Sequence, residues 1–221
     1  MSPDLMMSRP LFVTFEGIDA CGKSTQIKLL ADFLHRRQIK TTQLRDPGST
    51  RVSEAVRNIL LDRKYADMSP WAELLLYEAA RAQLVQESVL PALKNGFVVL
   101  CDRFYDSTTA YQGFARQLDP VVVEKANAIG SCGLIPDLTI FIDIDVQESE
   151  QRKQLLGHTL DRMEAEGKQF LQRVRDGYQA LWAKEPNRIF RVNGSESIET
   201  VQEQIQTLLI QKWKDMFSSE Q

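Results

Sequence analysis

The feature that most constrains this chain is a glycine-rich spacing, G-x-x-x-x-G-K-S, found as Gly17-Ile18-Asp19-Ala20-Cys21-Gly22-Lys23-Ser24. An apolar run at 11–15 precedes it and predicts a buried strand, and apolar residues at helical spacing follow it from 27 to 34. In that setting the backbone N–H groups of the turn and the positive end of the helix dipole converge on one point. A glycine turn that binds nothing would not need all three features, so we predict a phosphate-binding loop.

The loop residues suggest how a nucleotide would be held. Lys23 is expected to reach the β and γ phosphates, and the hydroxyl of Ser24 is expected to hold Mg²⁺. The candidate ATP-binding residues of this segment are Gly17, Ile18, Asp19, Ala20, Cys21, Gly22, Lys23, Ser24 and Thr25.

Composition excludes several other classes of protein. The 221 residues include 27 basic and 30 acidic side chains, for a net charge of -3, so we expect no nucleic-acid partner. Three cysteines and the histidines His35 and His158 lack metal-ligand spacing, which favours reduced thiols and a cytoplasmic location. No apolar run approaches membrane length, so we expect no membrane association.

Strand-like and helix-like segments alternate along the chain. Strands are expected at 11–16, 40–45, 97–101, 138–143 and 188–192, and helices at 23–38, 52–61, 71–94, within 104–130, on both sides of 157–167, and at 198–217. This order predicts an α/β fold, in which helices cover both faces of a parallel sheet and ligands bind at the carboxyl ends of the strands. We expect one domain over 1–221, with residues 1–9 as a flexible extension.

Polar residues follow three of the expected strands. Arg45-Asp46 comes after the second strand and Asp102-Arg103 after the third, while the phosphate-binding loop follows the first. A single Asp-Arg pair is more often a surface ion pair, but three such strand ends on one rim favour a site. The planar fork of arginine suits phosphate, and Asp102 suits a water-mediated contact to Mg²⁺.

Four segments together resemble the thymidylate kinase family, in the order that the family has them: Arg45–Thr50, Tyr77–Arg81, Leu100–Gly113 and Leu160–Glu164. The resemblance implies the three-layer P-loop kinase fold with a short lid at about 157–167, and a homodimer. It also implies transfer of a phosphoryl group from ATP, with Mg²⁺, to thymidine 5′-monophosphate (dTMP).

The resemblance further implies roles for individual residues. Arg45 and Arg103 would hold the monophosphate, Arg81 would hydrogen-bond the thymine edge, and Tyr77 would stack on the base. Tyr111 would lie under the sugar and exclude a ribose 2′-hydroxyl. The implied dTMP-binding set is Asp19, Arg45, Asp46, Tyr77, Arg81, Arg103, Thr108, Tyr111 and Gln112. Asp46 stands where the family usually has Glu, and Tyr77 stands where it more often has Phe.

The implied catalytic set is Lys23, Arg103, Asp19 and the lid residue Arg162, with Arg152 as a second lid arginine at the ATP site. The lid is expected to be mobile when empty and to close over ATP, which would bring Arg162 to the transferring phosphate.

The expected chemistry needs no general base. A phosphomonoester has a second pKa of about 6, so its oxygens are largely anionic at neutral pH. A deoxynucleoside kinase, the first alternative, would need a base such as Asp46, but Arg45 and Arg103 are out of place around a neutral acceptor. A nucleotide-dependent switch, the second alternative, would need an Asn-Lys-x-Asp guanine motif, which the sequence lacks.

Overall fold

Five short strands form one parallel sheet in the order β2-β3-β1-β4-β5. The strands are β1 (Phe12–Glu16), β2 (Thr41–Arg45), β3 (Val98–Asp102), β4 (Leu138–Asp143) and β5 (Ile189–Asn193). The computed structural model describes residues 10–155, 157 and 161–217, so the expected extension at 1–9 lies outside the described residues, as do Leu160 and His158 of the expected lid.

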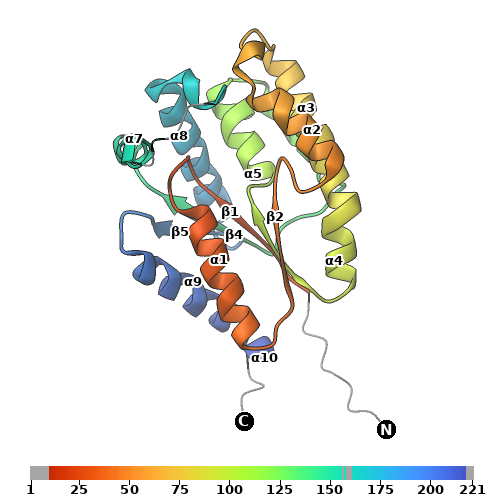
Figure 1. Cartoon of the computed structure of the whole chain (residues 1–221), viewed down its shortest axis with the longest axis vertical. Coiled ribbons are helices and arrows are strands. Elements are labelled where there is room, and N and C mark those ends of the chain that lie inside the picture. Colours follow the sequence, from red (N-terminus) through yellow and green to blue (C-terminus); the bar gives the residue numbers. More distant parts are fainter. Residues whose placement is uncertain (1–9, 156, 158–160, 218–221) are drawn as a thin grey trace.

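Helices cover both faces of this sheet, as Figure 1 shows. They are α1 (Lys23–Arg36), α2 (Arg51–Leu61), α3 (Pro70–Leu84), α4 (Leu90–Lys94), α5 (Tyr105–Thr108), α6 (Pro120–Gly130), α7 (Val146–Leu155), α8 (Lys168–Lys184), α9 (Ile198–Lys212) and α10 (Lys214–Phe217), with π-helical turns at Val85–Val89 and Thr109–Ala115 and 3₁₀ turns at Arg63–Tyr65 and Glu164–Glu166. The expected α/β class is confirmed, and each expected strand is present to within a residue or two.

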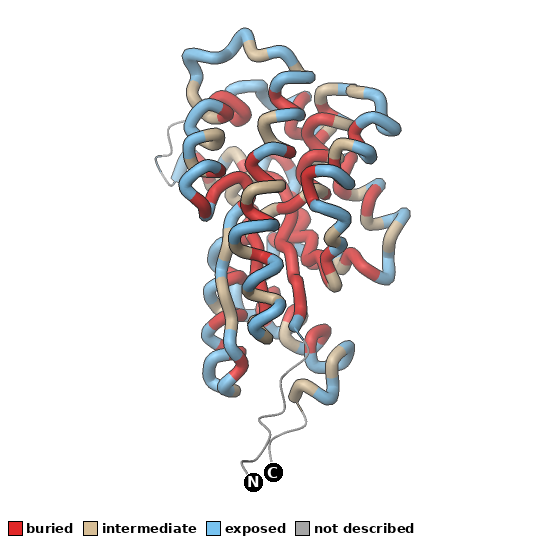
Figure 2. Tube along the Cα trace, turned by 90° about the vertical axis from the view of Figure 1, so that its right-hand side faces the viewer, coloured by how far each residue is buried: buried red, intermediate tan, exposed pale blue. Residues whose placement is uncertain are grey.

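Alternation along β1 divides the core between the two faces of the sheet. Val13 and Phe15 join the larger apolar cluster, which includes side chains of α1 and α9, while Phe12 packs with the cluster around α3 and β3. Figure 2 shows the buried strands running through the centre of the molecule, with exposed residues on the outer sides of the helices. By the same alternation, Glu16 at the end of β1 points to the face that Phe12 occupies and is fully buried.

The long helix expected at 71–94 begins as the sequence indicates but is not regular throughout. The hydroxyl of Ser69 accepts the backbone N–H of Ala72 at 3.2 Å, and Pro70 occupies the first turn. The helix then widens into a π-helical turn at Val85–Val89 before it continues as α4. Pro91 explains the irregularity, since it has no N–H to donate to the preceding turn.

Gly17 is required where β1 enters the phosphate-binding loop. Its φ is +137°, and a Cβ at this position would lie 2.4 Å from the carbonyl oxygen of Ile142 in β4. Gly22, with φ of +103°, turns the chain into α1. The loop is therefore held close against the neighbouring strand, and its first residue has no room for a side chain.

Candidate active site

The phosphate-binding loop closes around the side chain of Lys23. The Nζ atom donates to the carbonyl oxygens of Gly17 at 3.1 Å and Ile18 at 3.2 Å. Ser24 opens α1 beside the end of β3, where its hydroxyl donates to Asp102 Oδ2 at 3.0 Å. Lys23, Ser24 and Asp102 line a broad cavity of about 710 Å³, which has room for a nucleotide.

Residues from the second half of the chain form the far wall of this broad cavity. Arg152 of α7 donates to the carbonyl oxygens of Ala20 at 3.3 Å and Gly194 at 2.8 Å. Lys153, the next residue, also lines the cavity and lies 3.9 Å from Glu164. The expected ATP-side residue Arg152 therefore lies beside the loop, and Lys153 adds a cation that the sequence did not single out.

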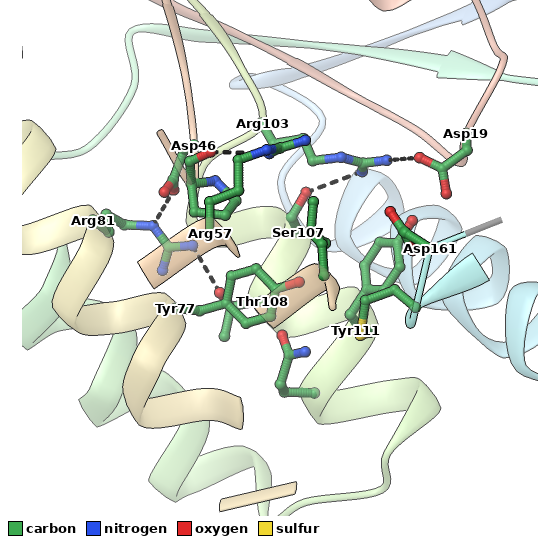
Figure 3. Close-up of a pocket in the computed structure, with 14 residues that line it drawn as sticks. Asp19, Asp46, Arg57, Tyr77, Arg81, Arg103, Ser107, Thr108, Tyr111 and Asp161 are labelled. Atoms are coloured by element: carbon green, nitrogen blue, oxygen red, sulfur yellow. Dashed lines mark hydrogen bonds and ion pairs between the residues drawn. The ribbon is translucent and has the colours of Figure 1, made fainter. Parts of the chain in front are cut away.

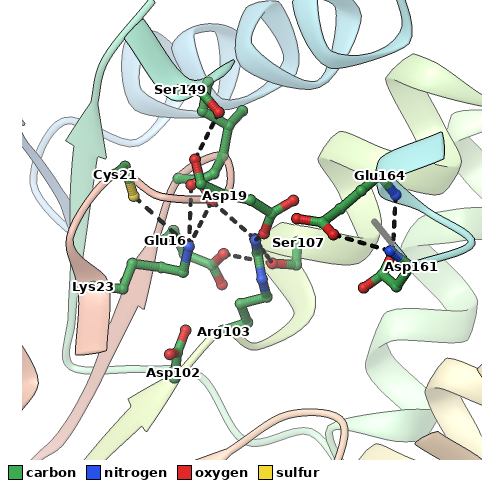
Figure 4. A network of polar contacts seen from close by, with 12 residues as sticks. Glu16, Asp19, Cys21, Lys23, Asp102, Arg103, Ser107, Ser149, Asp161 and Glu164 are labelled. Atoms are coloured by element: carbon green, nitrogen blue, oxygen red, sulfur yellow. Dashed lines mark hydrogen bonds and ion pairs between the residues drawn. The ribbon is translucent and has the colours of Figure 1, made fainter. Parts of the chain in front are cut away.

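Arg103 lies between the loop and the rest of the site. One terminal nitrogen pairs with Asp19 at 2.6 Å, and the other donates to the carbonyl oxygen of Gly17 at 2.9 Å (Figure 4). Burial opposes ionisation of Asp19, but the charges of Arg103, Lys23 and Lys153 outweigh it, so the pKa of this carboxyl lies below its ordinary value. Asp19 is therefore an anion at neutral pH.

A second, narrow cavity opens on the other side of Arg103 (Figure 3). It is lined by Tyr77 and Arg81 of α3 together with Thr108, Tyr111 and Gln112. The family resemblance implies an acceptor site for these five residues, and the structure brings them to one cavity. The cavity volume is about 90 Å³, enough for about three waters, whereas ligand sites usually need about 300 Å³ or more. A nucleotide would therefore have to displace part of the wall.

Arg81 is held rigidly at the base of this narrow cavity. Its Nε donates to Asp46 at 2.5 Å, one terminal nitrogen donates to Glu78 at 2.6 Å, and the other donates to Thr108 at 2.8 Å. The side chain is 1% exposed. Two of its five N–H groups remain after these bonds, so the fork can still donate to a ligand in the cavity.

Two other side chains of the narrow cavity have distinct polar surroundings. The hydroxyl of Tyr111 is buried and has no hydrogen-bond partner within the described part of the chain, while its ring lies under the Arg103 guanidinium at 5.2 Å. Gln112 donates to Glu73 at 2.8 Å. The unpaired hydroxyl indicates a polar group that a ligand would have to satisfy.

The arginine that lines the narrow cavity from this part of the chain is Arg57, and not Arg45 as the sequence analysis expected. Arg45 pairs with Glu54 at 2.9 Å, its side chain is 49% exposed, and it lines the broad cavity rather than the narrow one. Arg57 of α2, which the sequence analysis missed, lines both cavities and donates to Pro47 O at 2.9 Å. Its signal in the sequence was its place in the helix that follows the Pro-Gly turn.

Arg162 lies beside the narrow cavity in this structure, and the lid movement that would bring it to the transferring phosphate stays a prediction. Its guanidinium is buried, pairs with Glu73 at 2.6 Å, and donates to the carbonyl oxygen of Leu60 at 2.6 Å. Its neighbours Asp161 and Met163 line the narrow cavity. In this arrangement Arg162 fastens the end of the lid over the acceptor side.

Comparison with known proteins assigns the chain to a family. The family model described as thymidylate kinase matches residues 15–205. The chain belongs to the thymidylate kinase family. It is 45% identical over 190 residues to the thymidylate kinase of Pelotomaculum thermopropionicum, covering 86% of this chain and 88% of that protein. It is 42% identical over 203 residues to that of Prosthecochloris aestuarii, covering 88% and 91%.

A solved structure agrees with these relatives. The crystal structure of thymidylate kinase from Ehrlichia chaffeensis superposes with a TM-score of 0.74 at 31% identity, covering 90% of this chain and 98% of that chain. Thymidylate kinases are nucleoside monophosphate kinases, so the family resemblance and the enzyme class expected from the sequence are confirmed. The two alternatives, a deoxynucleoside kinase and a non-catalytic switch, are not supported by these relatives.

Replacing Lys23 tests the broad cavity as a phosphate site. Lys23→Ala removes a positive charge that is placed for the transferring phosphate, and the loss of one such donor costs about 10²–10³ in rate. We expect kcat to fall by about that factor while the melting temperature stays within a few degrees. Near-normal turnover by the folded variant would contradict the assignment. Lys28→Ala, an exposed lysine one turn further along α1, is the matched control.

Proposed function

We propose that the chain transfers the γ-phosphoryl group of ATP to dTMP, giving dTDP and ADP, in the broad and narrow cavities described above. One observation carries the proposal: the two cavities share a wall made of Asp19, Asp46, Arg57 and Arg103. A donor phosphate in one cavity and an acceptor phosphate in the other would meet at this wall. The two arginines suit the combined negative charge of both groups.

The donor side of the proposal rests on the loop and on Mg²⁺. Ser24 and Asp102 supply a hydroxyl and a carboxylate side by side, which are oxygen ligands of the kind that Mg²⁺ takes, with waters and substrate phosphates filling the rest of its shell. Bound there, the ion would neutralise charge on the ATP phosphates. Lys23 would reach the same phosphates, and Arg152 and Lys153 would bind on the outer side.

The acceptor side rests on Arg103, Arg57 and the narrow cavity. Arg103 would hold the monophosphate in line with ATP, while Asp19 fixes the direction of its guanidinium. Because the monophosphate is already anionic, catalysis reduces to alignment and stabilisation of charge. Tyr77 would stack on the base, and the unpaired hydroxyl of Tyr111 would meet the sugar.

A panel of acceptors tests the proposed function. Thymine and uracil present a carbonyl to the free N–H groups of Arg81, whereas cytosine presents an amino donor at the same edge. A buried N–H group that faces another donor has no partner, and this can lower kcat/KM for the wrong substrate by a factor of up to about 10⁴. We expect kcat/KM to fall in the order dTMP, dUMP, dCMP in a coupled assay with ATP, and deoxynucleosides to be inactive. Equal use of dCMP and dTMP would contradict the proposal.

The panel is run on the unchanged protein for a structural reason. Arg81→Ala would leave Asp46 and Glu78 buried without their common partner, and breaking a buried ion pair costs about 3–5 kcal/mol. A loss of selectivity in that variant could not be separated from a loss of folding.

The position of Arg162 predicts which substrate its replacement affects. If Arg162 fastens the wall of the narrow cavity, then Arg162→Ala loosens Asp161 and Met163, and KM for dTMP rises by about tenfold or more. KM for ATP should stay within about twofold. Arg152→Ala is the matched control, with the opposite pattern expected. A fall in kcat alone, with KM for dTMP unchanged, would instead support the sequence-based role at the transferring phosphate.

We also propose a homodimer formed through the outer face of α2, α3 and α6. These neighbouring helices expose apolar side chains that a monomer would leave in water: Val52, Ile59, Trp71, Leu75, Val121, Val122 and Ile129. Leu75 is 65% exposed, although its neighbour Leu74 is buried in the core.

Among the helices that the structure describes, none has the length and apolar character needed to span a membrane.

Leu75→Glu tests the dimer. A charge at the centre of an apolar interface should convert the dimer to a monomer in sedimentation or light-scattering measurements at micromolar concentration. Ile210→Glu changes a partly exposed side chain on α9, on the other side of the molecule (Figure 1), and should leave the assembly unchanged. A wild-type protein that is already a monomer would contradict the proposal.

A further inference from the structure

Glu16, which none of the proposed roles uses, is a fully buried carboxylate at the last position of β1, directly before the phosphate-binding loop. One of its oxygens accepts the backbone N–H of Phe104 at 2.7 Å. The other accepts the hydroxyls of Ser107 at 2.6 Å and Tyr178 at 2.8 Å. Three elements that are distant in the sequence, β1, the segment after β3, and α8, therefore meet at this one side chain. Figure 4 shows Glu16 beside Ser107 and Arg103.

The same two hydroxyls also contact Arg103. A terminal nitrogen of Arg103 donates to Tyr178 Oη at 3.0 Å and to Ser107 Oγ at 3.3 Å. The two hydroxyl oxygens also lie 2.8 Å from each other. A carboxylate can only accept, so each hydroxyl can give its single hydrogen to an ionised Glu16 and keep its lone pairs for Arg103. The hydroxyl groups of Ser107 and Tyr178 thus form two bridges between Glu16 and Arg103. An ionised Glu16 makes both hydroxyl oxygens acceptors for the guanidinium.

The backbone of Arg103 depends on Glu16 as well. Its φ is +69°, a left-handed conformation that costs free energy in a residue with a side chain. The N–H of Arg103 is held by the carbonyl oxygen of Phe15 at 3.0 Å, and the N–H of Phe104 is held by the Glu16 carboxylate. Two consecutive residues of β1 therefore fix the strained residue from both sides.

We propose that Glu16 is a positioning residue for the acceptor phosphate: as a carboxylate it holds Arg103, through Ser107 and Tyr178 and through the backbone of Phe104, in the direction that binds dTMP. The proposal rests on the proposed function, in which Arg103 holds the monophosphate. Glu16 itself contacts no substrate.

The surroundings of Glu16 make this role dependent on pH. Burial, and after it repulsion from Asp106, raises the pKa of Glu16 to about 7, although Arg103 and the two hydroxyl hydrogen bonds oppose the shift. The titratable and charged groups around it are Arg103, Asp106 with its partner Arg188, Tyr105, Tyr178 and Cys101. A protonated Glu16 would donate its hydrogen to one of the two hydroxyls. That hydroxyl would then direct its own hydrogen away from Glu16 and would no longer be a good acceptor for Arg103.

Glu16→Gln tests the proposal, because the amide can keep the bond to Phe104 but presents N–H groups to Ser107 and Tyr178. Calorimetric titration with dTMP alone should show about tenfold weaker binding than wild type at pH 8, the size expected for losing one charged hydrogen-bond acceptor. At pH 5.5 wild-type Glu16 is itself mostly protonated, so the two proteins should agree within about twofold. The titration of dTMP near pH 6 affects both proteins alike.

Two further measurements separate positioning from a general loss of structure. The ATP dissociation constant should stay within about twofold. Because the pKa of Glu16 is raised in the folded protein, its contribution to stability is fully present below the unfolded-state pKa and is lost as the pH rises through about 7. The neutral amide of the Glu16→Gln variant does not ionise, so the variant does not lose stability in this way. The melting temperature of Glu16→Gln at pH 8 should therefore not fall. Asp137→Asn is the matched control: this carboxylate accepts the N–H of Phe12 at the opposite end of β1.

Tyr178→Phe is the second variant, which keeps the carboxylate and removes one bridge. It should weaken dTMP binding by about threefold and leave ATP binding unchanged. Wild-type dTMP affinity in both variants, or a Glu16→Gln defect of equal size at pH 5.5 and pH 8, would overturn the role of Glu16. If the unchanged protein neither binds nor phosphorylates dTMP, it is the proposed function that fails.

Discussion

The contact of Arg103 with the carbonyl oxygen of Gly17 is the interaction on which the arrangement of the site depends. The same carbonyl oxygen accepts from Lys23, so one backbone atom relates Lys23 of the broad cavity to Arg103 of the wall that both cavities share. Gly17 can offer this atom only because it has no side chain against β4. The spacing of Lys23 and Arg103 is therefore set by the backbone directly after β1, and neither side chain has much freedom to move.

Several buried charges around the narrow cavity occur in pairs or larger groups. Arg81 lies between Asp46 and Glu78, and Glu73 takes both Arg116 and Arg162. Isolated buried charges would be prohibitively unfavourable, while groups of this kind fix geometry at little net gain in stability. Rigid placement of donors suits the proposed discrimination between bases by a single hydrogen-bonding edge.

The sequence predicted the sheet and the loop because strand ends and glycine spacing are local signals. The expected acceptor residues came from the family resemblance, and their roles stay predictions. The sequence did not identify Glu16 or Glu73, since a carboxylate that will be buried looks the same in a sequence as one that stays in water. It gave no sign of the partner of Arg162 for a related reason. A polar segment between glycines indicates a lid, but only the fold shows that its arginine meets Glu73 on α3. Arg57 was missed because helix α2 shows no motif of its own.

The three-way bonding of Arg81 has a consequence for how acceptor preference can change over evolutionary time. If Arg81 reads the base as proposed, a substitution at this position would alter that recognition and, in the same step, leave two carboxylates in the core without their counter-ion. A lineage could shift to another base only if Asp46, Glu78 and Arg81 changed almost together. In this proposal, a single substitution of Arg81 would destabilise the fold, and the preference for the base would therefore seldom change by one mutation.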